Sequence, residues 1–425
     1  MEPLATLVLV GSRPRKAAVA VLAGAVEACA STRSLPVRVA APGKDLANAV
    51  RTARARGPVV VGWSLCSSDV ARAAEERARV ESAGGPALHV AGGPHPTADP
   101  EGALRAGFDL AAVGEGERTL PGLLARVASG GDPRGPGLAW LEDGLLRRGP
   151  RAAPVDLDEV PPFATGLGVF GPVEITRGCP HACRFCQTTQ IQGGRVRHRS
   201  ARAVARFVGE MALRGMRDVR FLSPSALGYG SPDGSACPLA VEELLARARE
   251  AHGPHGRLFL GSFPSEVRPE HVTPAALRVL RRFVANDHLV IGAQSGSDRV
   301  LAASRRGHGV EEVRRAVRWS LEEGFRVKVD LVFGLPGESR EDAAATRHLM
   351  RELAALGAEI HGHSFLPLPG TPWQGEPPGA VDAETRRELD RLASRGRSSG
   401  QWRRQEELGR ALASSAPRLP RWPAS

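Results

Sequence analysis

The sequence contains few lysines and no long apolar segment. Only Lys16, Lys44 and Lys328 are lysines, although Lys and Arg together number 57 and the net charge is +11. The basic residues are therefore almost all arginines. They alternate with glutamates along helical faces, as in residues 75–79, which is typical of a solvated surface. The charge alone does not indicate a nucleic-acid partner, and a nucleic-acid substrate is the less favoured alternative.

Other absences concern location. No apolar run approaches the length needed to cross a bilayer, so we expect no membrane span. No basic head precedes an apolar segment after Met1, so we expect no signal peptide. Six cysteines in 425 residues are too few for a disulfide scaffold. The sequence predicts a cytoplasmic protein of two or three domains.

Three of the cysteines are concentrated in one short segment. Cys179, Cys183 and Cys186 follow a strand-like run and form a Cys-x3-Cys-x2-Cys pattern. Thiolates are soft ligands, and three of them at this spacing favour an iron–sulfur cluster. No fourth cysteine lies nearby, so one iron of a [4Fe–4S] cluster would have no protein ligand. The alternative is a zinc site closed by His181, whose spacing would strain a tetrahedron.

With Phe185 as the aromatic residue before the last cysteine, the motif resembles the signature of the radical S-adenosylmethionine (SAM) enzymes. The resemblance implies that the three cysteines are the metal ligands and the catalytic centre. It implies that the open iron binds the amino and carboxylate groups of SAM, which is cleaved reductively to methionine and a 5′-deoxyadenosyl radical. An electron donor such as flavodoxin or ferredoxin is then required.

The pattern of strands and helices predicts an α/β protein in four parts. Apolar strands alternating with helices predict a doubly wound, Rossmann-like parallel sheet over residues 1–130. Residues 131–170 are interpreted as a linker, and residues 376–425 as a helical C-terminal extension. Between them, residues 171–375 have the rhythm of a partial (β/α)6 TIM-type barrel. Its expected strands are Val173–Thr176, Val219–Leu222, Leu258–Gly261, Val290–Ala293, Val327–Phe333 and Glu359–Ser364.

Polar residues and glycines follow these strands, where the active residues of such barrels lie. By resemblance, the expected SAM-binding residues are Phe185, Ser223, Ser225, Glu266, Arg268, Gln294, Ser295, Phe333, Gly334 and Leu335. Arg268 and Glu266 could instead form a surface ion pair, and the serines after Gln294 could cap a helix. The Gly-Gly-Glu sequence common in the family is missing at residues 223–225.

His361 and His363 are two residues apart in an expected strand, so they share a face. If that face is the barrel interior, they could handle protons at the substrate. A structural role is the alternative.

The ends of the strands in residues 1–130 are rich in glycine and small polar residues. They resemble the cobalamin-binding domain that precedes the barrel in one radical SAM subgroup. The expected cobalamin residues are Ser64, Ser67, Gly92, Gly93, His95, Gly114, Glu115, Gly116 and Glu117. The Asp-x-His-x-x-Gly motif of many cobalamin domains is absent, but the resembled subgroup often binds cobalamin without a histidine ligand. Glu115 and Glu117 could equally cap a helix.

The resemblance implies a cobalamin-dependent methyltransferase that acts on an unactivated carbon of a small-molecule or peptide substrate. One alternative is a radical SAM enzyme without functional cobalamin that modifies RNA or a peptide. The other is a non-catalytic iron–sulfur protein. The sequence does not identify the substrate.

Overall fold

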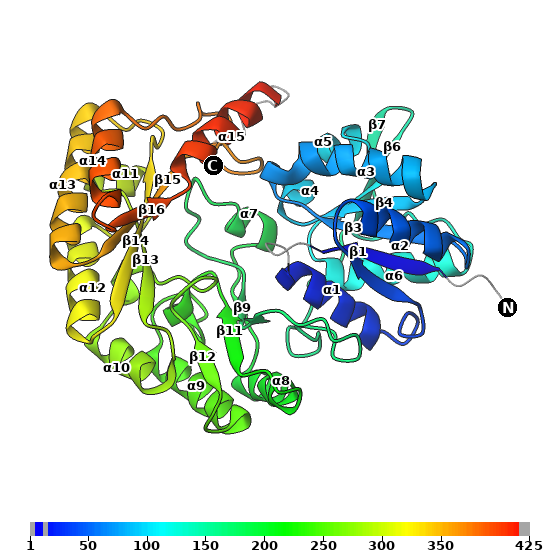
Figure 1. The fold of residues 1–425 in the computed structure, drawn as a ribbon, viewed down its shortest axis with the longest axis horizontal. Coiled ribbons are helices and arrows are strands. Elements are labelled where there is room, and N and C mark those ends of the chain that lie inside the picture. Colours follow the sequence, from blue (N-terminus) through cyan, green and yellow to red (C-terminus); the bar gives the residue numbers. More distant parts are fainter. Residues whose placement is uncertain (1–4, 12–15, 416–425) are drawn as a thin grey trace. The chain divides into compact units, whose positions relative to one another are not determined.

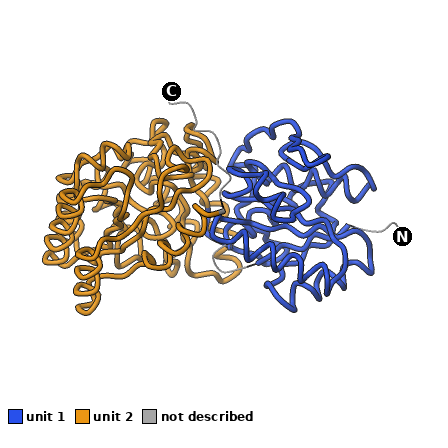
Figure 2. The backbone as a smooth tube through the Cα atoms, turned by 90° about the horizontal axis from the view of Figure 1, so that it is seen from above, with its two compact units in different colours: residues 1–173 blue, residues 174–425 orange. Residues whose placement is uncertain are grey.

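The computed structural model describes residues 5–11 and 16–415. The chain divides into two compact units, Met1–Val173 and Glu174–Ser425 (Figure 2). Each unit is built around its own β-sheet structure. In the described residues, no helix is both long and apolar enough to cross a membrane.

The first unit contains a seven-stranded sheet in the order β2-β1-β3-β4-β5-β6-β7 (Figure 1). Its strands are β1 (Thr6–Val10), β2 (Val37–Ala40), β3 (Val59–Ser64), β4 (Leu88–Gly92), β5 (Leu110–Ala112), β6 (Leu138–Glu142) and β7 (Leu145–Arg148). The first five are parallel. Their order is that of flavodoxin-like doubly wound sheets, which bind ligands at the carboxyl ends of the strands.

Helices cover both faces of this sheet. They are α1 (Lys16–Ala28), α2 (Lys44–Arg54), α3 (Val70–Gly84), α4 (Pro94–Ala98), α5 (Pro100–Arg105) and α6 (Gly116–Ala128). Val8 of β1 packs in one core with residues of α2 and α3. Its neighbours Leu7 and Leu9 pack in a second core with residues of α1 and α6. Because both faces are buried, the strands are continuously apolar, and the expected parallel-sheet domain is confirmed.

The segment interpreted as a linker is instead part of the sheet. Strand β6 pairs antiparallel with β5, and β7 pairs antiparallel with β6. Leu138 and Ala139 of β6 are buried against the sheet. Residues 131–170 therefore belong structurally to the first unit, because their hairpin buries apolar side chains that a solvated linker would leave exposed.

The second unit has the expected partial barrel. Its strands are β8 (Val173–Glu174), β9 (Thr176–Arg177), β10 (Arg197–His198), β11 (Asp218–Leu222), β12 (Arg257–Phe259), β13 (His288–Gln294), β14 (Arg326–Phe333), β15 (Glu359–Ser364) and β16 (Ser398–Gly400). Strands β9 and β10 form a separate antiparallel pair, and the others form the orders β12-β11-β8 and β13-β14-β15-β16. Parallel bridges from Leu258 to Val284 and from Val267 to Ile291 link the segments between β12 and β13. The short strand β16 is an addition that the pattern did not predict.

The helices of the second unit are α7 (Thr188–Gln192), α8 (Ala201–Leu213), α9 (Pro238–His252), α10 (Pro274–Phe283), α11 (Asp298–Ala303), α12 (Val310–Glu322), α13 (Arg340–Leu356), α14 (Ala383–Ala393) and α15 (Trp402–Ser415). Helices α9, α10, α12 and α13 lie along the outside of the barrel strands, whereas the short α7 is not part of this outer layer (Figure 1). Along β14, buried apolar residues such as Val329 and Leu331 alternate with Lys328 and Asp330. The apolar set faces the helices, so the second set faces the interior, which is polar at this depth.

Candidate functional site

The three cysteines lie on the loop between β9 and α7. Gly178, just before Cys179, has φ +87°, and a Cβ atom there would lie 2.2 Å from the carbonyl oxygen of Arg195. Only glycine fits this close approach of two backbone segments. The backbone N–H of Cys186 donates a hydrogen bond of 3.0 Å to the carbonyl of Cys183, which tightens the last turn of the loop.

The donor set fits an iron–sulfur cluster better than a single zinc ion. All three cysteines are free thiols, and their sulfur atoms are not all within 4.8 Å of one another. Ligand sulfurs at about 2.3 Å from one zinc ion would lie about 4 Å apart. The thiolates of a [4Fe–4S] cluster each bind a different iron and are spaced more widely.

His181 does not complete a compact metal site in the described residues. Its ring lies 5.9 Å from the ring of His271, centroid to centroid. Burial, with the nearby charge of Arg268, lowers the pKa of His181 to about 4. The ring is therefore a neutral packing element of the loop at neutral pH.

Two buried guanidinium groups approach the sulfur of Cys183. Nη1 of Arg306 lies 3.5 Å from this sulfur and Nη1 of Arg268 lies 3.9 Å from it. Arg306 is anchored by a 2.7 Å hydrogen bond from Nη2 to the carbonyl of Gly292, and Arg268 by a 2.5 Å bond from Nε to Glu270. Two positive charges therefore lie beside one sulfur.

Glu270 balances part of this positive charge. Burial acts to raise its pKa, but His308, 3.1 Å away, and Arg268 together hold the pKa of Glu270 well below its usual range. Sequence reasoning expected Arg268 at the SAM site but missed Arg306. The only signal for Arg306 was its position shortly after the Gln-Ser-Gly-Ser run, in a chain where arginine is common.

Gln294 lies at the end of β13 in a strained conformation. Its φ is +73°, in the left-handed region that non-glycine residues rarely adopt, and the pairing with β14 shifts register there. A Cβ atom at Gly292 would lie 2.7 Å from Nε2 of Gln294 and 3.3 Å from Nη2 of Arg306. The bulge therefore places an amide and a guanidinium side by side. Strained backbone of this kind is typical of ligand-binding positions.

The three serines expected at the SAM site make hydrogen bonds within the protein. Oγ of Ser223 donates to the carbonyl of Ser225 at 2.8 Å, and Oγ of Ser225 lies 3.2 Å from Nδ1 of His271. Oγ of Ser295 accepts the N–H of Ser297 and lies 3.4 Å from Oγ1 of Thr346. Their contact with SAM stays a prediction.

Phe185 and the segment after β14 meet in one apolar cluster. Phe185 packs partly buried against this cluster, which contains Leu335, Phe365 and Trp373. Gly334 has φ +69°, and its N–H donates a 2.8 Å hydrogen bond to Glu338. Phe333 is buried in the last position of β14. The cysteine loop and the loop after β14 are thus adjacent, as expected for residues that share one ligand.

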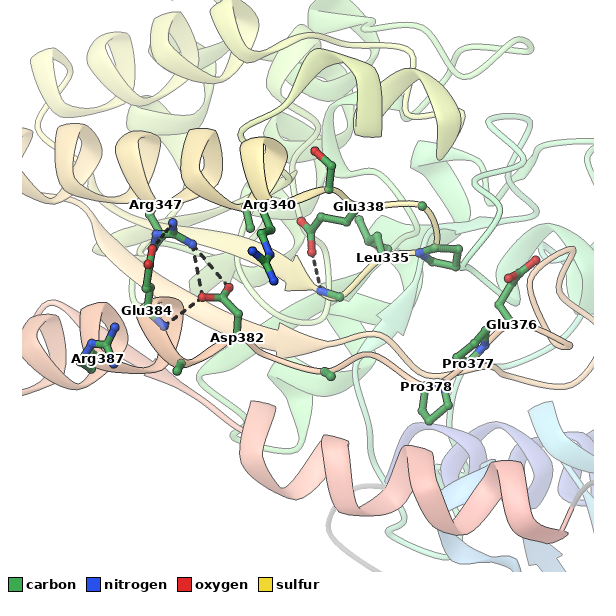
Figure 3. A pocket seen from close by; sticks show the side chains of 17 residues that line it. Leu335, Glu338, Arg340, Arg347, Glu376, Pro377, Pro378, Asp382, Glu384 and Arg387 are labelled. Atoms are coloured by element: carbon green, nitrogen blue, oxygen red, sulfur yellow. Dashed lines mark hydrogen bonds and ion pairs between the residues drawn. The ribbon is translucent and has the colours of Figure 1, made fainter.

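A cavity of about 740 Å³ lies beside the same loop, between its outer side and the segment 376–387 (Figure 3). Its lining is charged, and Arg347 bridges Asp382 and Glu384 across it. Burial raises the pKa of Glu338 to about 7. Gly334 and Leu335 are the only expected site residues that line this cavity, so it is separate from the cysteine loop.

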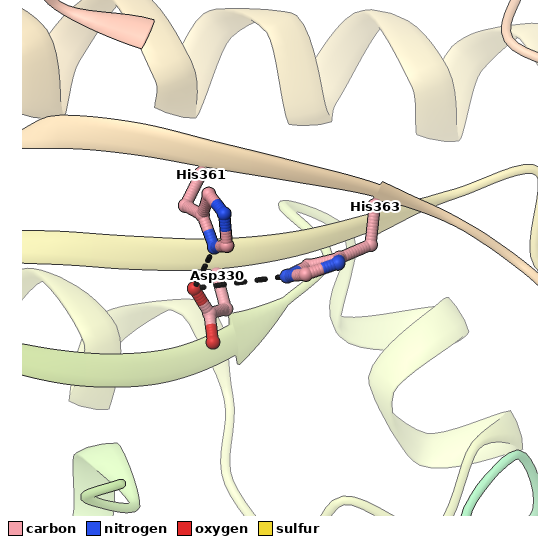
Figure 4. A group of neighbouring side chains, drawn as sticks. All are labelled: Asp330, His361 and His363. Carbon is pink, nitrogen blue, oxygen red and sulfur yellow. Dashed lines mark hydrogen bonds and ion pairs between the residues drawn. The ribbon is translucent and has the colours of Figure 1, made fainter. Parts of the chain in front are cut away.

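His361 and His363 converge with Asp330 (Figure 4). Oδ1 of Asp330 lies 2.9 Å from Nδ1 of His361 and 3.9 Å from Nε2 of His363. Burial raises the pKa of Glu266 to about 7, with Asp330 adding to the rise and the two histidines opposing it. The structure therefore groups one predicted SAM residue, Glu266, with the two predicted substrate residues, and adds Asp330, which sequence reasoning missed.

In the first unit, the expected cobalamin residues lie after β3, β4 and β5, which are neighbours in the sheet. Ser64 and Gly92 are the last residues of β3 and β4. Gly93 has φ +98°, and a Cβ atom there would lie 3.0 Å from the backbone nitrogen of Leu65. Gly114 also has a positive φ of +87°, with open space where a Cβ would lie. Because these residues lack a side chain, a ligand could approach the backbone of the rim closely.

Some polar side chains of this rim already make hydrogen bonds within the protein. Nδ1 of buried His95 lies 3.1 Å from Oγ of Ser67, and burial lowers the pKa of His95. A carboxylate oxygen of Glu115 accepts the N–H of Val155 at 2.8 Å. Gly116 and Glu117 begin α6, where Glu117 is buried. His95 is thus engaged within the protein, which fits a site that uses no histidine ligand.

Two family models match the chain. The B12 binding domain matches residues 5–124, and the radical SAM superfamily matches residues 173–350. The matches correspond to the doubly wound sheet and to the partial barrel. The radical SAM domain implies a [4Fe–4S] cluster and SAM, and the B12-binding domain implies cobalamin.

Solved structures with the same fold include the radical SAM methyltransferase TsrM from Kitasatospora setae. It has a TM-score of 0.69 at 19% identity, covering 89% of this chain and 75% of that one. The cobalamin-dependent SAM radical enzyme OxsB has a TM-score of 0.64 at 15% identity, covering 82% of this chain and 52% of that one.

Curated relatives include a tRNA-2-methylthio-N(6)-dimethylallyladenosine synthase from Shewanella sp. (strain W3-18-1). It is 32% identical over 263 residues, which are 57% of this chain and 51% of the relative. The same enzyme from Saccharophagus degradans is 32% identical over 220 residues, 51% of this chain and 46% of the relative. The chain thus spans about half the length of these relatives. From its two family matches, the chain contains a radical SAM domain, preceded by a B12-binding domain.

Proposed function

We propose that the protein is a cobalamin-dependent radical SAM methyltransferase that methylates an unactivated carbon of a small molecule or peptide. The observation that carries this proposal is the pairing of a B12-binding domain with a radical SAM domain in one chain. The fold shared with TsrM, a radical SAM methyltransferase whose structure contains cobalamin and a [4Fe–4S] cluster, supports it.

The chain's own residues have separate tasks in this proposal. Cys179, Cys183 and Cys186 would hold the cluster by three thiolates, and Arg306 and Arg268 would stabilise the charge on the sulfur of Cys183. Gln294, strained beside Arg306, would orient the bound SAM. The cluster supplies the electron that cleaves SAM, and cobalamin supplies methyl-group chemistry. A flavodoxin or ferredoxin would reduce the cluster.

The glycine-rich rim of the first unit would bind cobalamin. Gly93 and Gly114, both with positive φ, place backbone without side chains at this rim. His95 would not serve as the cobalt ligand, because Ser67 and burial already hold its ring. TsrM has been solved with tryptophan as its substrate, which makes a small polar molecule a reasonable substrate class for this chain.

A second candidate function is RNA modification without cobalamin. The identity to tRNA methylthiotransferases, 32% over 263 residues, favours it. The two functions share the cysteine loop and the barrel, so they differ in the first unit. Binding of cobalamin to the purified protein separates them.

The experiment uses the full chain, reconstituted without oxygen with iron, sulfide and hydroxocobalamin. We expect about four irons per chain and a visible spectrum of bound cobalamin after gel filtration. With dithionite and methyl-labelled SAM, we expect 5′-deoxyadenosine and transfer of the label to the cobalamin fraction. Cluster-loaded protein that binds no cobalamin would reject the methyltransferase in favour of RNA modification.

Two cysteine variants are the controls. Cys183→Ala removes one cluster ligand and should abolish 5′-deoxyadenosine formation. Cys237→Ala changes a free thiol outside the cysteine loop and should not. Equal loss in both variants would show that the assay reports general instability.

A further inference from the structure

The cluster of Asp330, His361 and His363 lies on two adjacent parallel strands. Asp330 of β14 is paired directly with His361 of β15, and Val332 with His363. The side chains of His361 and His363 keep 33% and 27% of their surface accessible, whereas Asp330 keeps 8%. The carboxylate is therefore the buried member of the cluster, and the two rings keep part of their surface accessible.

Gln405 of α15 determines which nitrogen of His363 carries the proton. The backbone N–H of Ser364 donates to Oε1 of Gln405 at 2.9 Å, so the oxygen of this amide must face Ser364. Nε2 of Gln405 then faces Nδ1 of His363 at 3.2 Å. An amide nitrogen only donates, so Nδ1 accepts and the ring proton is on Nε2. That N–H is directed at Asp330.

His361 carries its proton on the opposite nitrogen. Its Nδ1 lies 2.9 Å from the carboxylate of Asp330, which can only accept, so Nδ1 donates. Nε2 of His361 is then the one nitrogen of the two rings that is left with a free lone pair. The hydrogen bond to Asp330 raises the pKa of His361, so this nitrogen readily takes a second proton.

Two histidines and a carboxylate are also a common ligand set for a metal ion, and the three ligand atoms lie within 4.8 Å of one another. Metal binding would require a lone pair on Nε2 of His363 and a proton on its Nδ1. That proton would point at the amide nitrogen of Gln405. In a metal site, the second ring nitrogen of a ligand histidine usually donates its proton to an acceptor. At His363 this nitrogen faces a donor, Nε2 of Gln405, which disfavours metal binding.

The charges around His361 come from several elements. Lys328 of β14 and Glu359 of β15 form an ion pair of 3.3 Å in the next layer of the interior. Glu266, after β12, and Arg306, after α11, act on the same group of side chains. Arg306 also lies 3.5 Å from the sulfur of Cys183.

We propose that Asp330, His361 and His363 form a proton-accepting site inside the barrel, with Nε2 of His361 as the accepting atom and Gln405 as a positioning residue. The substrate would present an N–H or O–H group to His361. That bond breaks, its electron pair stays on the substrate, and the proton forms a new N–H bond on Nε2. The carboxylate of Asp330 balances the resulting imidazolium. The proposal deepens the proposed function, because it assigns a polar, proton-bearing group to the substrate.

The test is histidine NMR on the full-length, cluster-loaded protein labelled with ¹⁵N-histidine, with signals assigned from single His→Asn variants. We expect His363 as the Nε2–H tautomer and His361 as the Nδ1–H tautomer that gains its second proton on Nε2. Asp330→Asn should lower the pKa of His361 below the wild-type value. Gln405→Glu, whose carboxylate accepts a proton from Nδ1, should move the His363 proton to that nitrogen.

Two matched control variants test whether these effects are specific to the site. Asp287→Asn removes the partner of His288 in an exposed pair of 2.7 Å and should leave the signals of His361 unchanged. Gln401→Glu, at an exposed position just before α15, should leave the signals of His363 unchanged. Zn²⁺ alone is titrated into the same protein as a probe for a metal site.

Three results would overturn the proposal. One is a His361 proton on Nε2 with none on Nδ1. Another is a His361 titration that Asp330→Asn does not change. The third is one bound Zn²⁺ per chain that is lost in His361→Asn. None of these measurements depends on methyl transfer. The proposed function can therefore be rejected while the proton-accepting site is confirmed, and the site can be rejected while the function is confirmed.

Discussion

Nη1 of Arg306 lies 3.5 Å from the sulfur of Cys183, although 123 residues separate them in the chain. The contact joins the loop after α11 to the middle cysteine of the motif. Hydrogen bonds to cluster sulfurs are one of the factors that set a cluster's reduction potential. Arg306 therefore links the end of β13, where Gln294 lies, to the residue that we propose as the middle cluster ligand.

Replacing Arg306 should make the cluster harder to reduce. Arg306→Gln removes a positive charge that stabilises the more negative, reduced state. We expect the reduction potential to fall by on the order of 59 mV, a tenfold change for one electron. An EPR-monitored redox titration of the reconstituted protein measures it. Arg305→Gln changes the exposed neighbour and should leave the potential unchanged; equal shifts in both variants would contradict a specific role.

Replacing Gln294 with glycine should raise the stability of the protein but weaken its binding of SAM. Gln294→Gly relieves the strain of φ +73° and should raise stability by roughly 1 kcal/mol, while it removes the amide. Gln294→Ala also removes the amide but keeps the strain. We expect both variants to bind SAM more weakly in anaerobic calorimetry, and only the glycine variant to have a higher Tm. Undiminished SAM binding in both would show that the amide does not contact the ligand.

Gly334 should tolerate no side chain. Gly334→Ala combines a φ of +69° with a Cβ atom 2.5 Å from the backbone nitrogen of Ala380, so the contact between two backbone segments must open. We expect a loss of about 3 kcal/mol or more, seen as a lower Tm of the second unit. Gly337→Ala has a similar φ of +76° but nothing within 4 Å, so it isolates the backbone strain alone. Equal losses of stability in the two variants would show that the close packing at Gly334 adds nothing to the backbone strain.

Glu338 should make stability fall as the pH rises. Burial raises its folded pKa from 4.5 to about 7, so the folded protein holds this proton more tightly than the unfolded chain does. Its contribution is complete below about pH 4.5 and is lost as the pH rises to about 7. At pH 8 the loss is about 1 to 3 kcal/mol.

Glu338→Gln keeps an oxygen that can accept the N–H of Gly334 but cannot ionise. The variant should gain Tm relative to the parent at pH 8 and lose that advantage at pH 5. Glu376→Gln, at the same cavity, is the matched control. A constant difference in Tm between Glu338→Gln and the parent at both pH values would contradict a buried, protonated Glu338.

The parts of the molecule that were predictable from sequence depend on local pattern. The cysteine motif is defined by spacing within eight residues, and the barrel strands by short apolar runs, so both could be inferred. The flanks of the hairpin β6–β7 are rich in glycine and proline, a composition that is typical of a linker. Its membership in the sheet depends on pairing with β5, which no local pattern encodes.

The site residues that were missed depend on tertiary contacts. Arg306 is one arginine among many, and only the folded chain brings it to Cys183. Asp330 lies in an apolar strand and becomes informative only beside His361, its partner in the neighbouring strand. The prediction for Ser223, Ser225 and Ser295 depends on their positions after strands. The structure shows that their hydroxyls also hold the turns themselves.

The short strand β16 has a consequence for anyone who shortens the chain. It pairs with residues 360–362 of β15, and Gly400 approaches Gly362 so closely that a Cβ atom would lie 2.2 Å from the carbonyl oxygen of Gly362. After β16, Oε1 of Gln405 accepts a hydrogen bond from the backbone N–H of Ser364. A truncation that removes residues 376–425 would therefore expose the hydrogen-bonding edge of β15, and such edges promote self-association. The C-terminal extension thus covers the edge strand of the barrel.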